Sequence, residues 1–419
     1  MTHFHRISGV LHVEDMPLPM LAEQVGTPAY IYSAEAIRSR YTALSDALAD
    51  LNLSIHYAVK ANSNQAVIKL LGGMGAGADV VSAGELARAL AAGIQADQIV
   101  FAGVGKTKDE IRQAIDADIH LFSVESQPEL EAISEVATSA GKSARVALRV
   151  NPDVDAKTHA KITTGKAENK FGVEIGFAAA FFARAAELPG VRAIGLSMHI
   201  GSQLLDLAPY EAAYARMADL ASDLMSKGYA LELLDLGGGL GIEYGAAKAP
   251  TPEDYADVVR RTVGGLGLKL AVEPGRWMVG AAGLLLTRVV YVKEGSAKRF
   301  VIVDGAMNDL IRPTLYEAEH RVELVCGASE TAQRPADLVG PICETGDYLA
   351  RNRDLPVVDA GDLIAFLDAG AYGAVMSSTY NSRPLVPEIL VDGAKWAVIR
   401  PRETIEHLIA RDTVPDWLV

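Results

Sequence analysis

The chain has 419 residues, 50% of them hydrophobic, which is enough for a large core and two domains. Its formal net charge of −14, from 53 acidic and 39 basic residues, argues against a nucleic acid or an anionic membrane as its main partner. Its two cysteines, Cys326 and Cys343, are too few for a disulfide framework or a cysteine-based metal site, so no metal is expected.

The N-terminal residues 1–20 contain acidic residues and prolines but no apolar signal-peptide core. Within this region, residues 4–13 have an extended character. The most apolar stretch of the chain, 277–292, is shorter than a membrane-spanning helix. These features predict a cytoplasmic protein without a membrane partner.

From about residue 34 to residue 278, short apolar strands alternate with alanine-rich helical segments. The expected strands are 54–59, 78–81, 99–102, 119–124, 145–150, 194–199, 232–236 and 269–273. Because parallel strands need such helical crossovers, the pattern predicts a TIM-type (β/α)8 barrel over residues 35–278. A doubly wound open sheet is the alternative, since a strand count does not prove closure. The long connection 151–176 is of a kind that often borders an active site.

After residue 279 the pattern changes to β-strands separated by Gly, Pro and Asp turns. The expected strands are 284–292, 300–303, 321–325, 337–342, 362–367, 385–391 and 395–399. We expect residues 1–34 and 279–419 to form one β-sandwich or barrel-like domain, with the barrel inserted between its two parts. The fold class is therefore α/β plus all-β.

Lys60 directly follows the expected strand 54–59, and Asn62-Ser63-Asn64 behind it supplies helix-starting residues. A lysine at this junction lies at the mouth of a barrel, where a partly desolvated amine can act as a nucleophile. Most strand-end lysines are solvated surface groups, so Lys60 needs support from other residues.

Other polar residues also follow the carboxyl ends of expected strands. His199 closes the sixth strand, Gly237-Gly238-Gly239 follows the seventh and Glu273 follows the eighth. In a barrel these strand ends share one face, which is where active sites are built.

The glycine run would let backbone N–H groups approach an anion closely, because no Cβ atom is in the way. An isolated glycine run is more often a tight turn. Here it lies in one of the last two βα loops, where barrels often bind phosphate, and Glu273-Pro-Gly-Arg276 lies in the other. A dinucleotide fingerprint is less favoured, because it would open the first βαβ unit.

Three further side chains have both a structural and a functional interpretation. Glu273 is either a carboxylate paired with Arg276 or the group that holds a proton on a heteroaromatic nitrogen. His199 is either a core histidine or a ring that stacks on a cofactor, with Ser202 as an extra phosphate donor. Asp79 lies in an otherwise apolar strand and needs a partner, for which Lys60 and His199 are the candidates.

A reactive lysine, a phosphate cradle and an acid for a ring nitrogen together describe a pyridoxal phosphate site. At these residues the sequence resembles the fold type III decarboxylases, which join an alanine-racemase-like barrel to a β domain, and the resemblance runs nearly end to end. The barrel motifs that carry it are Tyr57-Ala-Val-Lys60-Ala-Asn62, Asp79-Val-Val-Ser-Ala-Gly-Glu85-Leu86, His199-Ile-Gly-Ser-Gln203, Gly237-Gly-Gly239 and Glu273-Pro-Gly-Arg276. Ala83 departs from the glycine expected at its position.

The resemblance implies roles for these residues. Lys60 would form the internal Schiff base, His199 would stack on the cofactor ring and Glu273 would contact the ring nitrogen. Cofactor contacts are also expected from Asp79, Ser202, Gly238, Gly239, Gly275 and Arg276.

Motifs of the β domain extend the resemblance. Cys343-Glu344-Thr345-Gly346-Asp347 resembles the family's catalytic cysteine motif, and Gly370-Ala371-Tyr372-Gly373 resembles its tyrosine motif. By resemblance, Cys343 reprotonates the intermediate, while Tyr372 reaches the phosphate or the substrate. With Lys60 and His199, Cys343 completes the expected catalytic set. In the family these β-domain residues enter the neighbouring subunit's site, which implies a head-to-tail homodimer. A free cysteine alone would more often be a small buried hydrophobe.

The segment 307–316 most resembles the diaminopimelate decarboxylases. Their substrate, meso-2,6-diaminopimelate, carries an ammonium and a carboxylate at its far end. A guanidinium binds a carboxylate through paired, charge-assisted hydrogen bonds. Arg312, Arg276 and Tyr316 are expected to hold that carboxylate, and Glu344 the ammonium, with Tyr372 beside the substrate. The resemblance implies decarboxylation to L-lysine and carbon dioxide.

The alternatives on the same fold are an ornithine, arginine or carboxynorspermidine decarboxylase and an alanine-racemase-type enzyme. A cofactor-carrying regulatory protein is the non-enzymatic alternative. It should lack the lysine or the cysteine motif, and both are present.

Overall fold

The computed structural model describes residues 3–155, 170–245, 248–327 and 333–418. The chain divides into two compact units. The first, which we call the β unit, comprises Met1–Ile37, Tyr244–Ala246 and Val279–Val419. The second, which we call the barrel unit, comprises Arg38–Glu243 and Ala247–Met278.

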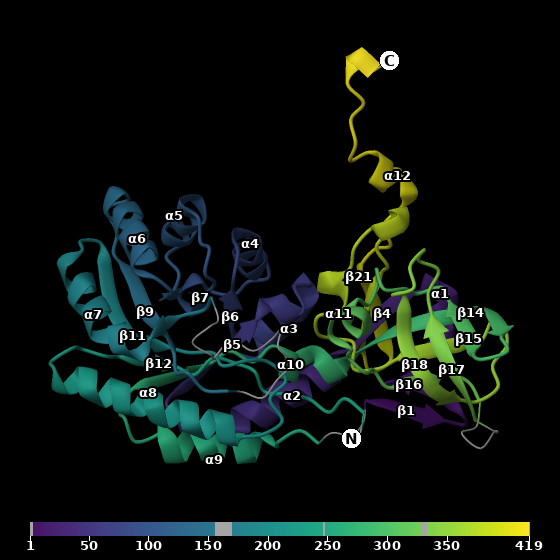
Figure 1. Ribbon diagram of the computed structural model, residues 1–419, viewed down its shortest axis with the longest axis horizontal. Helices are drawn as coiled ribbons and strands as arrows, with labels where there is room; N and C mark the ends of the chain where they lie inside the picture. Colours follow the sequence, from purple (N-terminus) through teal and green to yellow (C-terminus); the bar gives the residue numbers. More distant parts are fainter. Residues whose placement is uncertain (1–2, 156–169, 246–247, 328–332, 419) are drawn as a thin grey trace. The chain divides into compact units, whose positions relative to one another are not determined.

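The barrel unit is built on a closed ring of parallel strands. In Figure 1 strands of this unit lie among the helices that connect them. In order around the ring these are β5 (Leu53–Ala58), β6 (Gly77–Val80), β7 (Ile99–Phe101), β8 (Leu121–Val124), β9 (Ala144–Asn151), β11 (Val191–Ser197), β12 (Leu233–Asp235) and β13 (Lys269–Val272). Parallel pairing of β13 with β5, with Leu270 opposite Leu53, closes the ring. The short β10 (Val173–Glu174) pairs with β9 outside it. The predicted barrel is confirmed, and the open-sheet alternative is wrong.

Helices connect these strands. They are α2 (Ala34–Ala47), α3 (Gln65–Gly73), α4 (Ala83–Ala91), α5 (Lys108–Ala117), α6 (Gln127–Ser139), α7 (Ala178–Glu187), α8 (Ala208–Ser226), α9 (Pro252–Thr262) and α10 (Arg276–Val279). Several begin at a side-chain cap, as at Thr107 and Thr251, whose hydroxyls accept hydrogen bonds from the third residue of their helices. Such caps satisfy N–H groups that have no partner inside the helix, so they fix where each βα loop ends.

The interior of the ring is filled by side chains. One buried apolar cluster takes a residue from each of six strands: Val100, Leu121, Ala147, Ile194, Leu233 and Ala271. The barrel is therefore a packed core, and its chemistry is confined to the loops at the strand ends.

The β unit contains a mixed sheet in the order β18-β17-β15-β14-β4-β20-β21, with β19 beside β14 and β16 beside β19. The strands are β4 (Ala29–Ser33), β14 (Gly283–Glu294), β15 (Arg299–Val303), β16 (Val322–Leu324), β17 (Arg334–Val339), β18 (Tyr348–Leu355), β19 (Leu363–Phe366), β20 (Glu388–Asp392) and β21 (Lys395–Arg400). Short helices are α1 (Leu18–Val25), α11 (Arg312–Tyr316) and α12 (Ile405–Ile409).

Two strands of this sheet were not expected from the sequence. β4 is buried along its whole length and pairs with both β14 and β20, so its apolar run belongs to a central strand. β18 is rich in charged residues, and four successive positions from Arg351 to Asp354 lack full burial. A strand with so little apolar periodicity gives a weak signal.

The extended character of residues 4–13 corresponds to a hairpin of β1 (Phe4–Ile7) and β2 (Val10–Val13), followed by β3 (Met16–Pro17). Its turn uses left-handed backbone at Ser8 (φ 49°) and Gly9 (φ 81°). The backbone N–H of Leu11 donates to Val325 O at 2.8 Å, so the hairpin joins the β unit.

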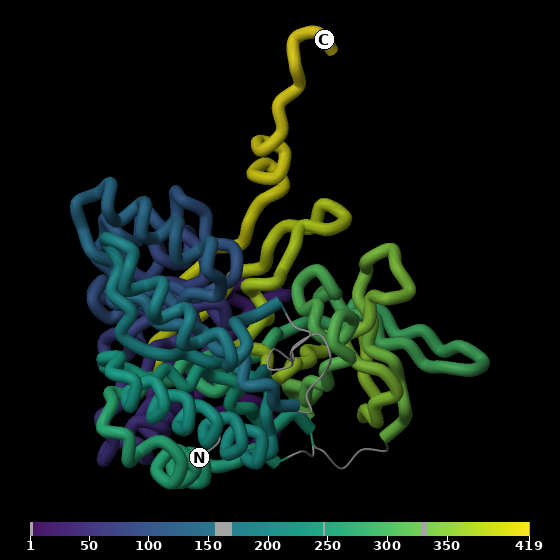
Figure 2. Tube along the Cα trace, turned by 60° about the vertical axis from the view of Figure 1, so that its left-hand side comes forward, coloured from purple at the N-terminus to yellow at the C-terminus, as the bar shows by residue number. Residues whose placement is uncertain are grey.

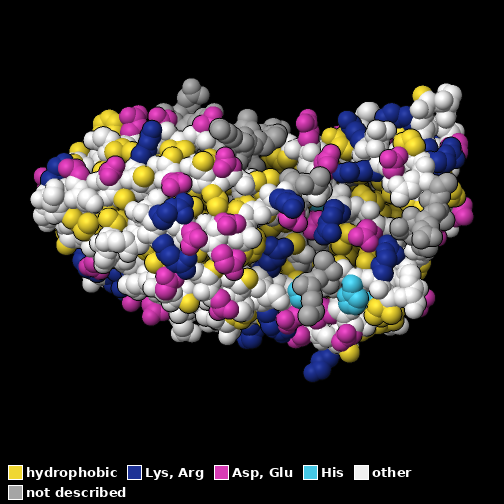
Figure 3. All heavy atoms as spheres, turned by 90° about the horizontal axis from the view of Figure 1, so that it is seen from below, with side chains coloured by type: hydrophobic (Ala, Val, Ile, Leu, Met, Phe, Trp, Pro, Cys, Tyr) yellow, Lys and Arg dark blue, Asp and Glu magenta, His cyan; other side chains and the backbone are white. Residues whose placement is uncertain are grey.

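At the other end of the chain, residues 404–418 run away from the sheet of the β unit (Figures 1 and 2). On the face drawn in Figure 3, acidic and basic side chains are interspersed. No helix formed by the described residues is long and apolar enough to cross a membrane.

Candidate active site

The carboxyl ends of the eight parallel strands bring the predicted polar residues of the barrel unit to one rim. They arrive from five strands: Asp79 lies on β6, while Lys60, His199, Gly237 and Glu273 follow β5, β11, β12 and β13. Closure of the ring is what makes residues 60 and 273 neighbours in space, because β5 and β13 are paired.

Lys60 and Asp79 form an ion pair at this rim, with Nζ 2.8 Å from Oδ2. The aspartate side chain is fully buried, whereas that of the lysine is 38% exposed. The Tyr57 hydroxyl donates to Asn62 O at 2.9 Å, which fixes the short turn that carries the lysine. The expected partnership of Asp79 is confirmed for Lys60.

His199 is held by the glycine run. The backbone N–H of Gly238 donates to Nδ1 of His199 at 3.2 Å, so this nitrogen is an acceptor and the ring proton is on Nε2. Burial, then the positive charges of Arg149 and Lys60, hold the pKa of His199 well below its usual range. The ring is therefore neutral at physiological pH and is fixed in orientation.

The glycine run is close to other backbone atoms on all sides. A Cβ atom would lie 2.2 Å from Met198 O at Gly237, 2.1 Å from Glu273 O at Gly238 and 2.4 Å from Gly201 O at Gly239. Gly237 (φ 69°) and Gly239 (φ 105°) also have left-handed backbone. Only glycine fits here, because any side chain would collide with the backbone of neighbouring loops.

Two predicted phosphate contacts are brought together on the same side of the barrel unit. Arg276 Nη2 donates to Ser202 Oγ at 3.0 Å, although these residues are far apart in sequence. Arg276 is buried, and the preceding Gly275 packs against Ala58 and Ala61, where a Cβ would lie 3.1 and 3.0 Å from theirs. A guanidinium and a hydroxyl in contact form a donor pair suited to a phosphate.

Glu273 interacts with a carboxyl group that the sequence did not single out, that of Asp235 on β12. Burial, then the negative charges of Asp235 and Asp79, raise the pKa of Glu273 well above its usual range. Burial also raises the pKa of Asp235, to about 6, although the Gly237 N–H donates to its Oδ1 at 2.9 Å. Glu273 therefore keeps its proton and donates it in a hydrogen bond to Asp235.

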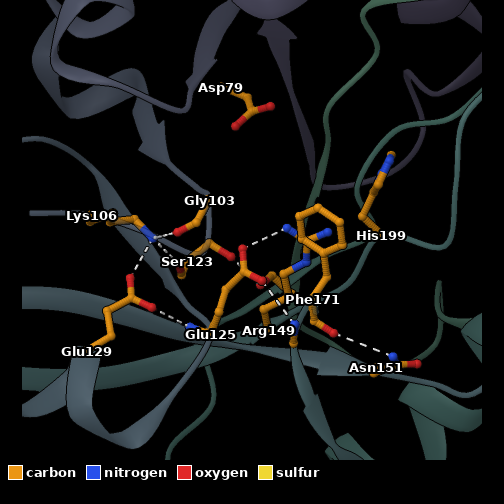
Figure 4. A network of polar contacts seen from close by, with 12 residues as sticks. Asp79, Gly103, Lys106, Ser123, Glu125, Glu129, Arg149, Asn151, Phe171 and His199 are labelled. Atoms are coloured by element: carbon orange, nitrogen blue, oxygen red, sulfur yellow. Dashed lines mark hydrogen bonds and ion pairs between the residues drawn. The ribbon is translucent and has the colours of Figure 1, made fainter. Parts of the chain in front are cut away.

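Arg149, on β9, was also missed from the sequence. Its Nη1 lies 2.9 Å from Glu125 Oε1, and its guanidinium lies over the Phe171 ring at 4.9 Å (Figure 4). The other oxygen of Glu125 accepts the Gly172 N–H at 2.9 Å. Glu125 thus neutralises Arg149 and anchors the described end of the long connection 151–176, whose residues 156–169 lie outside the described residues.

A buried ion pair of Lys106 and Glu129 contacts Glu125, the partner of Arg149. Lys106 Nζ lies 2.6 Å from Glu129 Oε1, and both side chains are buried. The other oxygen of Glu129 accepts the Glu125 N–H at 2.8 Å (Figure 4). The signal that reveals Asp79, a charged residue in an apolar strand, would also have found Arg149 and Asp235.

Arg312 belongs to the β unit, at the start of α11, and is buried. Its Nη1 donates to His320 Nε2 at 3.0 Å, and His320 Nδ1–H donates to Leu367 O at 2.9 Å. The guanidinium also lies 4.8 Å from the centre of the Tyr244 ring. The arginine is thereby fixed in place, and Tyr316 ends the same helix.

Cys343 and Glu344 lie in an exposed loop of the β unit. Asp347 holds this loop from within: its Oδ1 accepts the Met307 N–H at 2.7 Å and its Oδ2 accepts the Ile342 N–H at 2.6 Å. Tyr372 follows β19 in the same unit, with left-handed backbone (φ 56°).

The predicted residues are thus divided between the two units. In the barrel unit, the rim carries Lys60, Asp79, His199, Ser202, Gly238, Gly239, Glu273, Gly275 and Arg276. The β unit carries Arg312, Tyr316, Cys343, Glu344 and Tyr372.

Pyridoxal phosphate fits the donors and acceptors of the barrel rim. Asp79 Oδ1 is a buried oxygen without a hydrogen-bond partner among the described residues, which indicates that a polar group belongs beside it. Lys60 supplies an amine, and the contact between Ser202 and Arg276 offers donors for a phosphate. A buried carboxylic acid at Glu273 suits a ring nitrogen.

Comparison with known proteins agrees with this chemistry. Residues 34–280 match the family model described as "Pyridoxal-dependent decarboxylase, pyridoxal binding domain". A diaminopimelate decarboxylase from Pseudomonas aeruginosa is 50% identical over 96% of this chain and 97% of its own, and one from Zymomonas mobilis is 48% identical over 100% of both. A crystal structure of diaminopimelate decarboxylase from Helicobacter pylori complexed with L-lysine has a TM-score of 0.91 and 41% identity, covering 94% of this chain and 98% of that one. The chain belongs to the diaminopimelate decarboxylases, a family of pyridoxal-dependent decarboxylases.

Proposed function

We propose that the protein removes one carboxylate from meso-2,6-diaminopimelate, with pyridoxal phosphate as cofactor, and releases L-lysine and carbon dioxide. The observation that carries the choice of substrate is Arg312. A buried guanidinium held by His320 at 3.0 Å is suited to bind a carboxylate that ornithine and arginine lack at their far end. A relative from Helicobacter pylori crystallised with L-lysine, the proposed product, supports the same choice.

The residues of the barrel rim hold the cofactor and keep it in the required protonation state. Lys60 is the amine for its aldehyde carbon, while Ser202 and Arg276 bind its phosphate. Neutral His199, oriented by Gly238, presents a flat ring for stacking. When bound, pyridoxal phosphate supplies an electron sink for the electron pair left on the α-carbon after carbon dioxide leaves.

Glu273 holds a proton in the pair that it forms with Asp235, because burial and the negative charge of Asp235 raise its pKa, and this pair would keep the ring nitrogen protonated. Gly238 already uses its N–H for His199, so a phosphate contact through that N–H would share the hydrogen bond. Gly239 and Gly275 lie at the phosphate end, where the lack of a side chain lets their loops pack closely against neighbouring atoms.

The residues of the β unit act on the substrate. Cys343 delivers the proton that replaces the lost carboxylate on the α-carbon. Glu344 pairs with the distal ammonium, Arg312 and Tyr316 bind the distal carboxylate, and Tyr372 contacts the phosphate or the substrate. The negative charge of Glu344 complements the distal ammonium of the substrate, and the positive charge of Arg312 complements its distal carboxylate.

We further propose a head-to-tail homodimer in the cytoplasm, with residues of each β unit completing the partner's site. The domain division at residues 35–278 is part of this proposal, since the β domain would then form the dimer interface. Sedimentation of the purified protein measures the assembly directly.

The function is tested by measuring carbon dioxide release from meso-diaminopimelate, ornithine, arginine, carboxynorspermidine and alanine. We expect kcat/KM for meso-diaminopimelate to exceed the others by at least about 10³-fold, because a site built to bind a polar group rejects an analogue that lacks it. Arg312→Met should remove most of this preference, whereas Arg334→Met, which changes an exposed arginine of β17, should not. Equal turnover of ornithine or arginine by the wild-type enzyme would overturn the assignment.

A further inference from the structure

Two residues outside the predicted site hold the loop that carries Cys343 and Glu344. The side-chain oxygen Oδ1 of Asn381 accepts the backbone N–H of Cys343 at 3.0 Å. The hydroxyl of the neighbouring Tyr380 donates to Glu344 Oε1 at 2.7 Å. Consecutive residues of one segment thus contact consecutive residues of the cysteine loop.

We propose that Tyr380 and Asn381 are positioning residues, which fix the proton donor Cys343 and the ammonium-binding carboxylate Glu344. This inference rests on the proposed function and adds residues to it. Neither residue touches the reacting atoms in the proposed mechanism, so each acts through its neighbour in the cysteine loop.

The backbone of the supporting segment is unusual. Asn381 (φ 53°) and Ser382 (φ 55°) both have left-handed backbone, although neither is glycine. This region costs most residues free energy, and asparagine tolerates it better than residues with bulky side chains. Two successive left-handed residues without glycine indicate that the surrounding structure imposes this backbone conformation. Here the conformation places the Asn381 side chain against the backbone N–H of Cys343.

We call Cys343, Glu344 and Thr345 the tip of the cysteine loop. Separate hydrogen bonds hold the residues at the base of this loop and of the supporting segment. Asn308 Nδ2 donates to Ser378 O at 3.2 Å, and the Ser378 N–H donates to Asn308 O at 2.9 Å. Asp347 holds the base of the cysteine loop against Met307, the residue beside Asn308. Both segments are therefore held by the adjacent residues Met307 and Asn308.

The tip itself is exposed. Cys343, Glu344 and Thr345 are all exposed on the single chain, so packing within the chain does not hold them in place. The hydrogen bond that Tyr380 donates to Glu344 and the one that Asn381 accepts from Cys343 restrict this tip, and Thr314 Oγ1 donates to Gly346 O beside it at 2.6 Å.

Charge supports the direction of the Tyr380 contact. The hydrogen bond to Glu344 raises the pKa of the Tyr380 hydroxyl, with burial and the charges of Glu344 and Cys343 adding to the effect. The hydroxyl therefore remains a donor across the neutral range. A carboxylate that accepts this bond keeps one oxygen fixed, which orients the other for a substrate ammonium.

The two residues should affect different kinetic constants. Asn381 fixes the cysteine, which acts after binding, so its loss should lower kcat. Tyr380 fixes the carboxylate that binds the substrate, so its loss should raise KM.

The test uses full-length protein in a Cys326→Ser background, so that Cys343 is the one thiol in the sequence. Asn381→Gly keeps the left-handed backbone and removes the acceptor, and Tyr380→Phe removes the donor. The matched controls are Asn352→Gly, at another left-handed asparagine (φ 48°), and Tyr291→Phe, at an exposed tyrosine of β14. Each protein is assayed for kcat and KM with meso-diaminopimelate and for the rate of iodoacetamide alkylation of Cys343 from pH 6 to pH 10.

We expect Asn381→Gly to lower kcat by about tenfold while KM stays within about twofold of the parent. The rate of Cys343 alkylation should change by about threefold or more. Effects of this size are expected from the loss of one hydrogen bond. Tyr380→Phe should raise KM by about three- to tenfold, with kcat within about twofold. Asn381→Asp keeps the acceptor but adds a negative charge, so its alkylation profile should shift to higher pH. Both control variants should match the parent.

Unchanged alkylation and unchanged kcat in folded Asn381→Gly, checked by circular dichroism, would overturn the role of Asn381. An unchanged KM in Tyr380→Phe would overturn the role of Tyr380. This measurement does not depend on whether the asparagine variant folds. If Cys343→Ala kept full activity, the proposed function of the cysteine would fail instead. The alkylation assay needs no substrate and separates the two failures.

Discussion

The Lys60 amine lies 2.8 Å from a carboxylate oxygen of Asp79, and the aspartate side chain is fully buried while that of the lysine is 38% exposed. The pair is thus asymmetric. Its acidic member depends on its partner for neutralisation, whereas its basic member is open to solvent and to an incoming aldehyde. The same contact therefore contributes to stability and keeps a nucleophile in place.

Lys60→Ala should destabilise the cofactor-free protein, because it leaves the Asp79 carboxylate buried without its counter-charge. The expected loss is about 1–3 kcal/mol in the free energy of unfolding, reduced from the value for a fully buried pair by the exposure of Lys60. Adding Asp79→Asn should restore part of it. Urea denaturation measures both, with Lys108→Ala as the control, since Lys108 pairs with Glu135 on the surface.

The same variant tests the covalent role of Lys60. Borohydride reduction should attach pyridoxal phosphate to the wild-type protein and to Lys108→Ala, but not to Lys60→Ala, as measured by mass spectrometry of the digested protein. Attachment at the usual level in Lys60→Ala would show that another amine is the anchor.

Cys343→Ala should reduce turnover strongly while the visible absorption of the bound cofactor survives. A single well-placed acid–base group contributes about 10²–10⁴-fold to a rate, so we expect kcat to fall within that range. Cys326→Ala is the matched control, because both cysteines are exposed. Wild-type turnover by Cys343→Ala would remove this residue from the mechanism.

The sequence predicted the barrel because its strands are apolar and its crossovers are helical over the whole stretch. All eight expected strands overlap observed ones, since burial on both faces produces a continuous apolar run. β4 was missed for a different reason: it is separated from its partner β14 by the entire barrel unit, and no local pattern shows this pairing. Closure also depends on a pairing between distant residues, Leu270 and Leu53.

Within the site, residues that carry recognisable motifs were predicted, and residues that act through them were not. Asp235 and Arg149 lie inside apolar strands, and their roles follow from Glu273 and Glu125, which directly follow β13 and β8. Tyr380 and Asn381 lie in an irregular segment, and their contacts to Cys343 and Glu344 need the fold before they can be seen. Sequence shows the reactive groups, whereas packing shows what orients them.

Asp235→Asn should change how the stability of the cofactor-free protein depends on pH. Burial raises the folded-state pKa of Asp235 to about 6, above its usual value of 3.8. The folded state therefore binds the proton more tightly, so this contribution to stability is complete below pH 3.8 and is lost as the pH rises through 6. In Asp235→Asn that loss, on the order of 1–3 kcal/mol, should disappear.

Urea denaturation at a series of pH values from 4 to 7 checks this expectation. The control is Asp223→Asn, which changes an exposed aspartate of α8 that pairs with Lys227. If Asp235→Asn and the wild type lost stability in parallel over this range, the raised pKa of Asp235 would not contribute to folding. Because the negative charge of Asp235 also raises the pKa of Glu273, the difference between the two proteins measures the titration of this coupled pair.

His56 should produce the opposite dependence over an overlapping range. It is buried on β5, where Nδ1–H donates to Gln98 O at 3.0 Å and Nε2 accepts from Ser54 Oγ at 3.0 Å. Burial, then the positive charge of the His120 ring stacked beside it at 6.2 Å, lowers its pKa to about 4. Its contribution to stability is therefore present above pH 6.5 and is lost as the pH falls through 4.

His56→Asn keeps a donor near the Nδ1 position and cannot become charged. We expect the wild type to lose about 1–3 kcal/mol more than this variant between pH 6.5 and pH 4, measured by urea denaturation. His407→Asn, at an exposed histidine of α12, should follow the wild type. Because the pKa of His120 is also lowered to about 4, His56→Asn should retain part of the acid sensitivity, and a double variant should remove more of it. Identical acid profiles for the wild type and His56→Asn would show that the buried ring is not what limits the stability of the barrel unit in acid.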